Sequence, residues 1–472
     1  MKQNNGLSAW QLTMLALGTV VGGSFFLGSS IAIRAAGPAI LPAFILGGIL
    51  VYIILTALSE MTVADPKPGS FRTYSEQLFG PWLGFMVGWV YWTGLILAMS
   101  SEATAASIFL QTWIPEVPLF VLAILIIVAV TLLNLLGAKL LSSLEGGLAA
   151  IKLGALIGFI GLAVALIVGL IPQKAPVGLG VLTREPLFPG GIAGVAGSML
   201  IVLFSYAGFE TIGLAASEAR TPHKTIPRAI KFTVISLVGL YCAVIATLLP
   251  LTPTGTLTEE VSPMVAALTA GGLNWAAGSI NVILVSAILS TMLAATFGLG
   301  RMVRSLADAG HAPFFLKDRG DIPLRGIIFS GAAMLASVGL GYILPEQMYI
   351  FLVSAGGFSL LFAYVIILAT HYRYRKMNGC PPQGNCQLAG FPYSSLLAIT
   401  GLIVVILTMP FIPGQGSGLY VGLILTAFYL ILYYVFKVLP AKMLGKITVY
   451  AKPLPANISN KKAISKEKKR ND

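Results

Sequence analysis

The chain has 472 residues, of which 57% are hydrophobic and 10% are charged, and its formal net charge is +13. Its mean hydropathy of +0.88 lies far above the range of soluble globular domains. This composition excludes a soluble protein and predicts an all-α integral membrane protein.

Apolar stretches long enough to cross a bilayer recur along the whole chain. A helix needs about 20 apolar residues to span roughly 30 Å of hydrocarbon. No long polar segment remains for a soluble domain, so we expect one membrane domain over residues 1–437 and a basic tail over 438–472. The predicted membrane-spanning helices number twelve and cover residues 11–33, 38–59, 83–111, 118–136, 147–171, 193–217, 232–251, 276–300, 326–345, 349–370, 394–413 and 417–436.

The basic residues are distributed asymmetrically between the loops. If the N-terminus is cytoplasmic, only Arg34, Lys174 and Arg184 of the 30 Lys and Arg residues fall on the outer side. An excess of Lys and Arg is typical of the cytoplasmic face. We therefore expect a protein of the cytoplasmic membrane with both termini in the cytoplasm, and the charge does not indicate nucleic-acid binding. The tail can either dock on anionic lipid or remain solvated.

The first apolar stretch contains the sequence GTVVGGSFF, residues 18–26. Gly18 and Gly22 are spaced four apart, which is the pattern of a close helix–helix contact. Gly22, Gly23 and Ser24 are consecutive, however, and consecutive weak helix formers favour an interruption of the helix. Backbone groups freed inside a bilayer are tolerated only where they line a cavity or bind a ligand. We therefore predict a helix that is broken at mid-membrane and has a binding role.

A second interruption is expected in the sixth stretch, which reads VLFSYAGFETIG over residues 202–213. Ser205, Ala207 and Gly208 interrupt an apolar run there, five stretches after the first break. Paired broken helices, one from each half, are typical of proteins built from inverted repeats around a midplane binding site. The twelve stretches then divide into two repeats, residues 11–171 and 193–370, and two additional helices, residues 394–436.

Ionisable residues within the apolar stretches are candidates for a functional role, because burying a charge in a membrane is costly. Lys152 can either sit in the core or extend to the cytoplasmic surface. Glu102 can either act at the binding site or lie near the outer interface. Glu210 directly follows the second interruption and can accept hydrogen bonds from backbone groups freed there. Glu218 begins the next loop, where a packing role is expected.

Other functional classes find little support in the sequence. The spans hold too few polar residues for a channel, and the two interruptions lack the ligands of a divalent-metal carrier. His223, His311 and His371 lie in loops or at a span end without a paired nucleophile, so neither an enzyme nor a cofactor is expected. Cys380 and Cys386 lie in a loop assigned to the cytoplasm, where disulfides rarely persist, and we assign them no function.

Several motifs together resemble a known family of membrane proteins. The first stretch carries GTVVGGSFFLG, the third carries SSEATAA, and the fifth begins with EGGLAAIKLGALIG. The sixth begins the long pattern FSYAGFETIGLAASEARTPHKTIPRAI, and GRMVRSLADAGHAP and DIPLRGI follow the eighth. With these motifs the chain resembles, over nearly its whole length, the amino acid–polyamine–organocation superfamily and, within it, the bacterial amino acid permeases.

The resemblance implies a LeuT-type fold, with a five-plus-five inverted repeat and two extra helices, in which an amino acid binds between broken helices 1 and 6. Its carboxylate would bind the backbone N–H groups of residues 22–24, since a half-helix start offers free donors. Carbonyls near Val20, Phe204 and Ala207 would accept from its ammonium group. Phe204 would be an aromatic lid beside Tyr206, although both can also be packing residues. The substrate residues implied are Val20, Gly22, Gly23, Ser24, Phe204, Tyr206, Ala207 and Gly208.

Two departures from the family pattern bear on the substrate. Ser24 stands where a third glycine is usual, and its hydroxyl can either contact the substrate or cap the half-helix. Residues 293–295, Leu-Ala-Ala, stand where many relatives carry Asn-Ser-Gly. The second departure favours a neutral, apolar amino acid.

The resemblance also places Lys152 beside the broken first helix, where sodium-coupled relatives hold a cation. Its ammonium group would replace that ion, so we expect sodium-independent, proton-coupled symport, with Glu102 and Glu210 as further candidates for proton coupling. An amino acid exchanger, or a receptor that binds amino acids without transport, remains an alternative. The expected partners are an amino acid, protons and membrane lipids, with no obligate protein partner.

Overall fold

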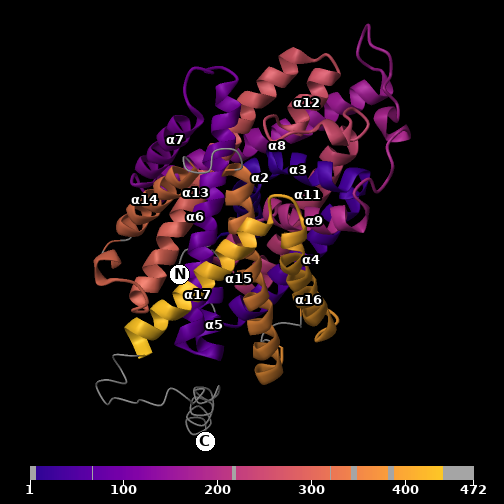
Figure 1. Ribbon diagram of the computed structural model, residues 1–472. Helices are drawn as coiled ribbons and strands as arrows, with labels where there is room; N and C mark the ends of the chain where they lie inside the picture. Colours follow the sequence, from indigo (N-terminus) through magenta and orange to yellow (C-terminus); the bar gives the residue numbers. More distant parts are fainter. Residues whose placement is uncertain are drawn as a thin grey trace, which may run out of the picture.

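The computed structural model describes residues 7–65, 67, 69–214, 219, 221–318, 320, 322–341, 348–380 and 387–438. Every regular element in this part of the chain is a helix (Figure 1), as the composition predicts. An isolated bridge between Leu7 and Ala219 is the only extended pairing among these residues. The short helices α5 (Phe71–Phe79) and α12 (Pro263–Ala270) lie toward opposite ends of the bundle.

Each of the twelve predicted stretches overlaps at least one helix of the structure. The remaining α-helices are α1 (Ala9–Val20), α2 (Gly23–Phe26), α3 (Gly28–Ala36), α4 (Ile40–Ala64), α6 (Pro81–Gln111), α7 (Leu119–Asn134), α8 (Ala138–Val168), α9 (Gly191–Ser205), α10 (Thr211–Leu214), α11 (Pro222–Leu248), α13 (Asn274–Asp308), α14 (Leu324–Gly341), α15 (Met348–Asn378), α16 (Tyr393–Thr408) and α17 (Gly416–Tyr433).

Within the described residues, eight helical segments are long and apolar enough to cross a membrane, and four shorter apolar helices accompany them. The shorter ones are α1, α7, α9 and most of α14. Both α1 and α9 are short because each ends at an interruption that the sequence predicts. The chain is therefore a multi-pass membrane protein, and the number of twelve spans stays a prediction.

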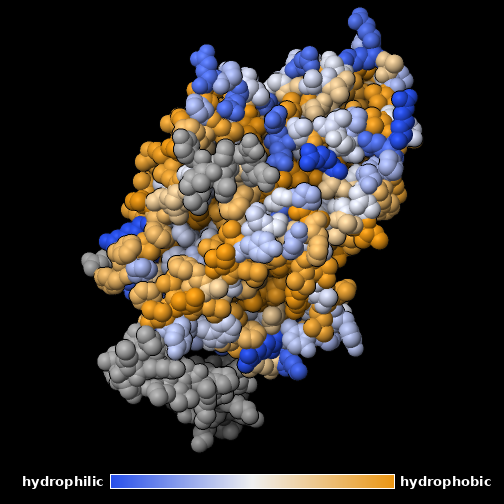
Figure 2. Space-filling model, in the orientation of Figure 1, coloured by the Kyte–Doolittle hydropathy of each residue, from blue (hydrophilic) through white to orange (hydrophobic). Residues whose placement is uncertain are grey.

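The surface of the bundle suits a hydrocarbon environment. Apolar side chains cover most of the middle of the face shown in Figure 2, and the strongly hydrophilic ones gather mainly toward its upper and lower ends. Leu125, Leu132, Ile157 and Leu397 are each more than half exposed. Apolar exposure on this scale marks a surface that contacts lipid or another apolar partner rather than water.

The helix α6 forms the centre of the bundle and positions the functional site. It is the most deeply buried of the candidate spans and packs against α13, α15 and the short helix α2. The helix α1, which leads to this centre, begins with a capping box. There the Ser8 hydroxyl accepts from the Gln11 N–H at 3.3 Å, and the Gln11 side chain accepts from the Ser8 N–H at 2.9 Å.

Some features of the sequence analysis fall on residues outside the described ranges, namely Glu218, Cys386 and the tail beyond Val438. Cys380 is described, and it is disulfide-bonded. This bond contrasts with the rarity of disulfides in the compartment to which the loop is assigned. That the two cysteines have no function stays a prediction.

Candidate functional site

The first interruption separates α1 from α2. The two residues between these helices, Val21 and Gly22, have extended backbone, with φ/ψ angles of −74°/101° and −147°/−165°. Leu27, between α2 and α3, keeps right-handed helical angles, so residues 23–36 form one half-helix. The N–H groups at the start of this half-helix have no partner within the helix itself and need acceptors from elsewhere.

The glycines of the first interruption are explained by space rather than by backbone angles. A Cβ atom on Gly22 would lie 3.0 Å from a carboxylate oxygen of Glu102 and 3.1 Å from the hydroxyl of Thr291. A Cβ atom on Gly23 would lie 2.9 Å from the same carboxylate and 3.1 Å from the Cβ atom of Ala105. The glycines therefore allow helices α6 and α13 to approach the unwound backbone closely.

Glu102 on α6 fills the start of the half-helix. Its Oε2 accepts from the N–H of Gly23 at 2.6 Å, and its Oε1 accepts from the N–H of Ser24 at 2.9 Å. The side chain is buried against the break, which favours the alternative that it belongs to the binding site. The rotation of α6 about its axis turns residue 102 inward, and distance along the helix could not reveal this.

Lys152 on α8 lies behind the same interruption and is fully buried. Its ammonium group donates to the carbonyl oxygens of Gly18 at 2.5 Å and Val21 at 3.2 Å. It also contacts the Thr291 hydroxyl at 3.2 Å and the Ala287 carbonyl at 3.5 Å. The alternative that Lys152 extends to the cytoplasmic surface is therefore wrong. Interruption of α1 supplies the carbonyl oxygens that make a buried ammonium group tolerable here.

The second interruption lies against the first. The helix α9 ends at Ser205, and α10 begins at Thr211. Gly208 has a φ of 103°, which favours glycine, and a Cβ atom there would lie 2.9 Å from the carbonyl oxygen of Thr19. The Thr19 hydroxyl donates to the Gly208 carbonyl at 3.2 Å, and the Ser205 hydroxyl donates to the Ser24 carbonyl at 3.0 Å. These hydrogen bonds join the two broken helices.

Glu210 stabilises the second interruption. One of its oxygens accepts from the N–H of Gly208 at 3.1 Å and from the hydroxyl of Tyr364 at 3.2 Å. The other accepts from the hydroxyl of Tyr91 at 2.7 Å. The carboxyl group is fully buried, and donors from α6, α15 and the interruption itself satisfy it.

A cavity of about 50 Å³ lies between the two interruptions. On this measure it holds a few water-sized groups. Leu95 and Met99 of α6 and Ala294 and Ala295 of α13 give it an apolar wall, with Glu102 and Glu210 also at its surface. The sequence-predicted substrate residues that line it are Val20, Ser24, Phe204, Ala207 and Gly208.

Tyr206 is not among the residues that line this cavity, and its role in substrate binding stays a prediction. Its hydroxyl donates to the carbonyl oxygen of Phe44 at 3.0 Å. Its ring packs against those of Phe44 and Tyr241, with centroids 5.9 and 5.3 Å apart. Each helical residue turns by about 100°, so Tyr206 and Phe204, which lines the cavity, point to nearly opposite sides. Gly22 and Gly23 lie behind the Glu102 carboxylate instead of at the cavity surface.

The family model described as amino acid permease matches residues 11–443. The chain belongs to the amino acid permease family. This family consists of membrane transporters and not of enzymes. The sequence likewise predicts no enzyme.

Several permeases of known organisms are similar to the chain over most of its length. The gamma-aminobutyric acid permease of Bacillus subtilis (strain 168) is 30% identical over 436 residues, which cover 91% of this chain and 93% of that protein. The amino-acid permease RocC of the same organism is 32% identical over 427 residues, which cover 87% and 90%. The gamma-aminobutyric acid permease of Escherichia coli (strain K12) is 32% identical over 417 residues, which cover 87% and 89%.

Sequence reasoning missed three side chains of this permease site. Thr291 bridges the ammonium group of Lys152 and the Val21 carbonyl, to which its hydroxyl donates at 2.9 Å. Tyr91 and Tyr364 hold Glu210. Each is a hydroxyl-bearing residue within an apolar helix. This is a weak sequence signal for a functional site, because many such hydroxyl groups only form a hydrogen bond with the backbone of their own helix.

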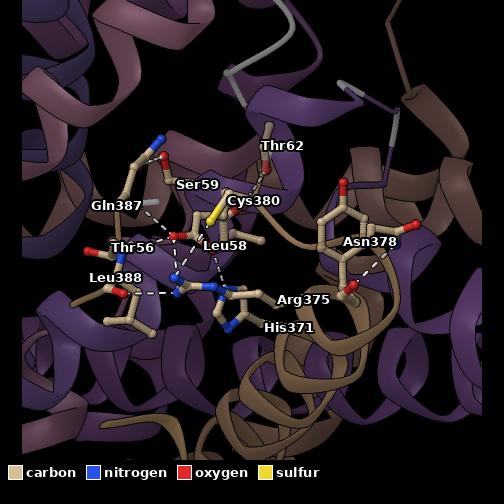
Figure 3. A network of polar contacts seen from close by, with 12 residues as sticks. Thr56, Leu58, Ser59, Thr62, His371, Arg375, Asn378, Cys380, Gln387 and Leu388 are labelled. Carbon is tan, nitrogen blue, oxygen red and sulfur yellow. Dashed lines mark hydrogen bonds and ion pairs between the residues drawn. The ribbon is translucent and has the colours of Figure 1, made fainter. Parts of the chain in front are cut away.

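A second buried polar cluster lies away from the cavity of the permease, where the C-terminal turns of α4 and α15 meet (Figure 3). Glu60 accepts from the N–H groups of Gln387 and Leu388 at 2.7 and 2.8 Å, and its other oxygen lies 2.7 Å from Nε2 of His371. Arg375 donates to the Leu388 carbonyl at 2.9 Å. The cluster ties the segment before α16 to α4 and α15, and the sequence analysis did not identify it.

Proposed function

We propose that this permease is a secondary active transporter that moves a neutral amino acid across the cytoplasmic membrane by alternating access, driven by protons and independent of sodium. Membership of the family supports amino acid transport at the level of class. The finer proposal rests mainly on one observation, the buried ammonium group of Lys152 behind the first interruption.

Sodium independence follows from the surroundings of that ammonium group. The carbonyl oxygens of Gly18 and Val21 and the hydroxyl of Thr291 are oxygen ligands of the kind that hard cations prefer. Lys152 already supplies a positive charge among these oxygens. A sodium ion would therefore meet electrostatic repulsion and would find its ligands occupied, so the driving ion is proposed to be the proton.

The substrate is proposed to bind between the two interruptions. Its carboxylate would accept from the N–H groups of residues 22–24, and its ammonium group would donate to carbonyls at Val20, Phe204 and Ala207. The Phe204 ring lines the cavity and would cover the substrate as a lid. The remaining lining near α13 is small and apolar, with Ala294 and Ala295, which supports a neutral amino acid.

The proposed architecture is a single transporter domain over residues 1–437 with twelve spans. It comprises inverted repeats over 11–171 and 193–370 and additional helices over 394–436, and residues 438–472 form a cytoplasmic tail. The asymmetric distribution of Lys and Arg supports cytoplasmic termini. Membrane lipids are the proposed surroundings, and no obligate protein partner is proposed.

The experiment is uptake of labelled amino acids into sodium-free proteoliposomes with an alkaline interior. The panel holds the twenty L-amino acids and γ-aminobutyrate, because two relatives are named for the latter. Accumulation that a protonophore abolishes is expected. Lys152→Ala should impair gradient-driven accumulation, whereas Lys224→Ala, at an exposed position on α11, serves as the matched control.

Two results would reject parts of this proposal. Exchange against preloaded amino acid without net accumulation would establish an antiporter and remove the proton gradient as the driving force. Binding without either form of transport would establish a receptor. Full accumulation by the Lys152→Ala protein would exclude the proposed role of this residue.

A further inference from the structure

The backbone donors proposed for the substrate carboxylate already hold a carboxylate of the protein. We call the N–H groups of Gly23 and Ser24 the carboxylate site. Each of these groups donates to a different oxygen of Glu102, at 2.6 and 2.9 Å. This two-point arrangement is the one that the α-carboxylate of an amino acid would adopt, so Glu102 occupies the site as a substrate mimic.

Two carboxylates cannot occupy the carboxylate site together. The Glu102 oxygens approach the backbone so closely that even a Cβ atom on Gly23 would lie only 2.9 Å from one of them. Like charges in contact also repel strongly where water is excluded, and paired carboxylates in one site normally share a proton. Binding of the substrate at this site therefore requires Glu102 to leave it.

We propose that Glu102 leaves the carboxylate site as a neutral carboxylic acid, and that the proton it takes up from solution is the proton coupled to transport. In this step the hydrogen bonds from Gly23 and Ser24 to Glu102 break and equivalent bonds to the substrate carboxylate form. One proton forms one O–H bond on Glu102, and no electrons are transferred. This inference rests on the proposed function and assigns its coupling residue.

The charges beside the unwound backbone favour protonation of Glu102 when the substrate binds. Lys152 and Glu102 contact the unwound backbone at Val21 and Gly23, interact electrostatically, and form a neutral pair before the substrate binds. Afterwards the substrate carboxylate takes the place of the Glu102 carboxylate beside the same ammonium group. If Glu102 remained ionised, two carboxylates would lie close to the single ammonium group of Lys152. The substrate's own ammonium group is proposed to bind the carbonyls at Val20, Phe204 and Ala207, and such crowding of like charges is unfavourable.

Lys152 is less suited to carry the coupled proton. Among the neighbours of its nitrogen are four oxygens, three of which are backbone carbonyls that can only accept. An ammonium group supplies three donors, whereas a neutral amine supplies two and exposes a lone pair toward these oxygens. The contacts of Lys152 thus favour a permanently charged group that holds the unwound segment in place.

The other titratable groups around Glu102 do not provide a second proton acceptor. Lys152 on α8, Tyr241 on α11 and Tyr349 on α15 are the described titratable residues that interact electrostatically with it. Both tyrosine hydroxyls already donate to backbone carbonyls, Tyr241 to Ser205 at 3.2 Å and Tyr349 to Gly23 at 3.4 Å. Glu102 itself borders the cavity.

The test is the pH dependence of substrate affinity in purified, detergent-solubilised protein. The probe is whichever of the twenty L-amino acids most raises the melting temperature of the wild type. If one proton is taken up on binding, the dissociation constant of the wild type rises about tenfold per unit of pH above the pH at which Glu102 ionises. Glu102→Gln should bind with an affinity that does not change with pH.

Two controls separate this inference from a structural effect. Glu116→Gln removes a carboxyl group at an exposed position between α6 and α7, outside the cavity lining, and should keep the pH dependence of the wild type. Proton uptake by the wild type, followed with an indicator dye in weakly buffered solution, should equal about one proton per bound amino acid. The dye measurement needs no variant and so decides the question even if Glu102→Gln fails to fold.

The outcomes are distinct from those that test the proposed function. A wild type that binds none of the amino acids would reject the proposed function and this inference with it. Binding without proton uptake would overturn the inference alone. Persistence of the pH dependence in Glu102→Gln would also overturn it and would move the coupled proton to another residue.

Discussion

Replacing Lys152 by Met tests the buried charge arrangement most directly. Met keeps an unbranched side chain but removes the ammonium group that donates to Gly18 and Val21. Removing one member of a buried charge pair typically lowers the free energy of unfolding by about 3–5 kcal/mol, because the partner is left uncompensated. We expect a decrease of that size for Lys152→Met, since Glu102 would then be a buried carboxylate without a nearby positive charge.

A double-mutant cycle separates this charge effect from the loss of packing. Glu102→Gln in the Lys152→Met protein removes the uncompensated charge, so we expect it to recover about 1–3 kcal/mol relative to the sum of the single changes. Glu210→Gln is the matched control and should show no such coupling, because tyrosine hydroxyls and a backbone N–H group satisfy Glu210.

The assay is denaturant unfolding in detergent micelles, with the free energy of unfolding of each protein taken from the linear dependence on denaturant. The reasoning is refuted if Lys152→Met lowers the free energy of unfolding by less than about 1 kcal/mol. It is also refuted if the effects of Lys152→Met and Glu102→Gln add within about 0.5 kcal/mol, as they do for independent sites.

Three further predictions concern other contacts of the structure. Gly23→Ala places a Cβ atom 2.9 Å from a Glu102 oxygen. We therefore expect this variant to lose amino acid uptake in proteoliposomes, although the purified protein still elutes as a monodisperse peak. Glu60→Gln weakens the buried contact with His371 and should lower the free energy of unfolding by about 2 kcal/mol; an unchanged thermal midpoint would contradict this. Burial lowers the pKa of His311 below its usual range, although Glu76 opposes the shift. Protonation of His311 therefore disfavours the folded state, and the free energy of unfolding should decline as the pH falls below about 6.5. The decline should be smaller in the His311→Gln protein.

Local sequence determined the helices and the positions at which two of them stop. Long apolar runs require helices in a bilayer because every backbone group must be satisfied within its own segment. The interruptions at Gly22 and Gly208 could be located because glycine is weakly helical and because a second break stood five stretches after the first. Lys152 stood out for a similar reason, as a charge inside an apolar helix.

The tertiary structure decided which side chains meet at the interruptions. Glu102 is 79 residues from Gly23 in the chain, and Lys152 is 134 residues from Gly18. Both contacts depend on how a helix is rotated about its own axis, and a nearly uniformly apolar sequence does not encode this rotation as an amphipathic pattern. The orientation of Tyr206 was decided in the same way. Lipid and protein interior are both apolar, so hydropathy identifies a span without indicating which of its faces turns toward the site.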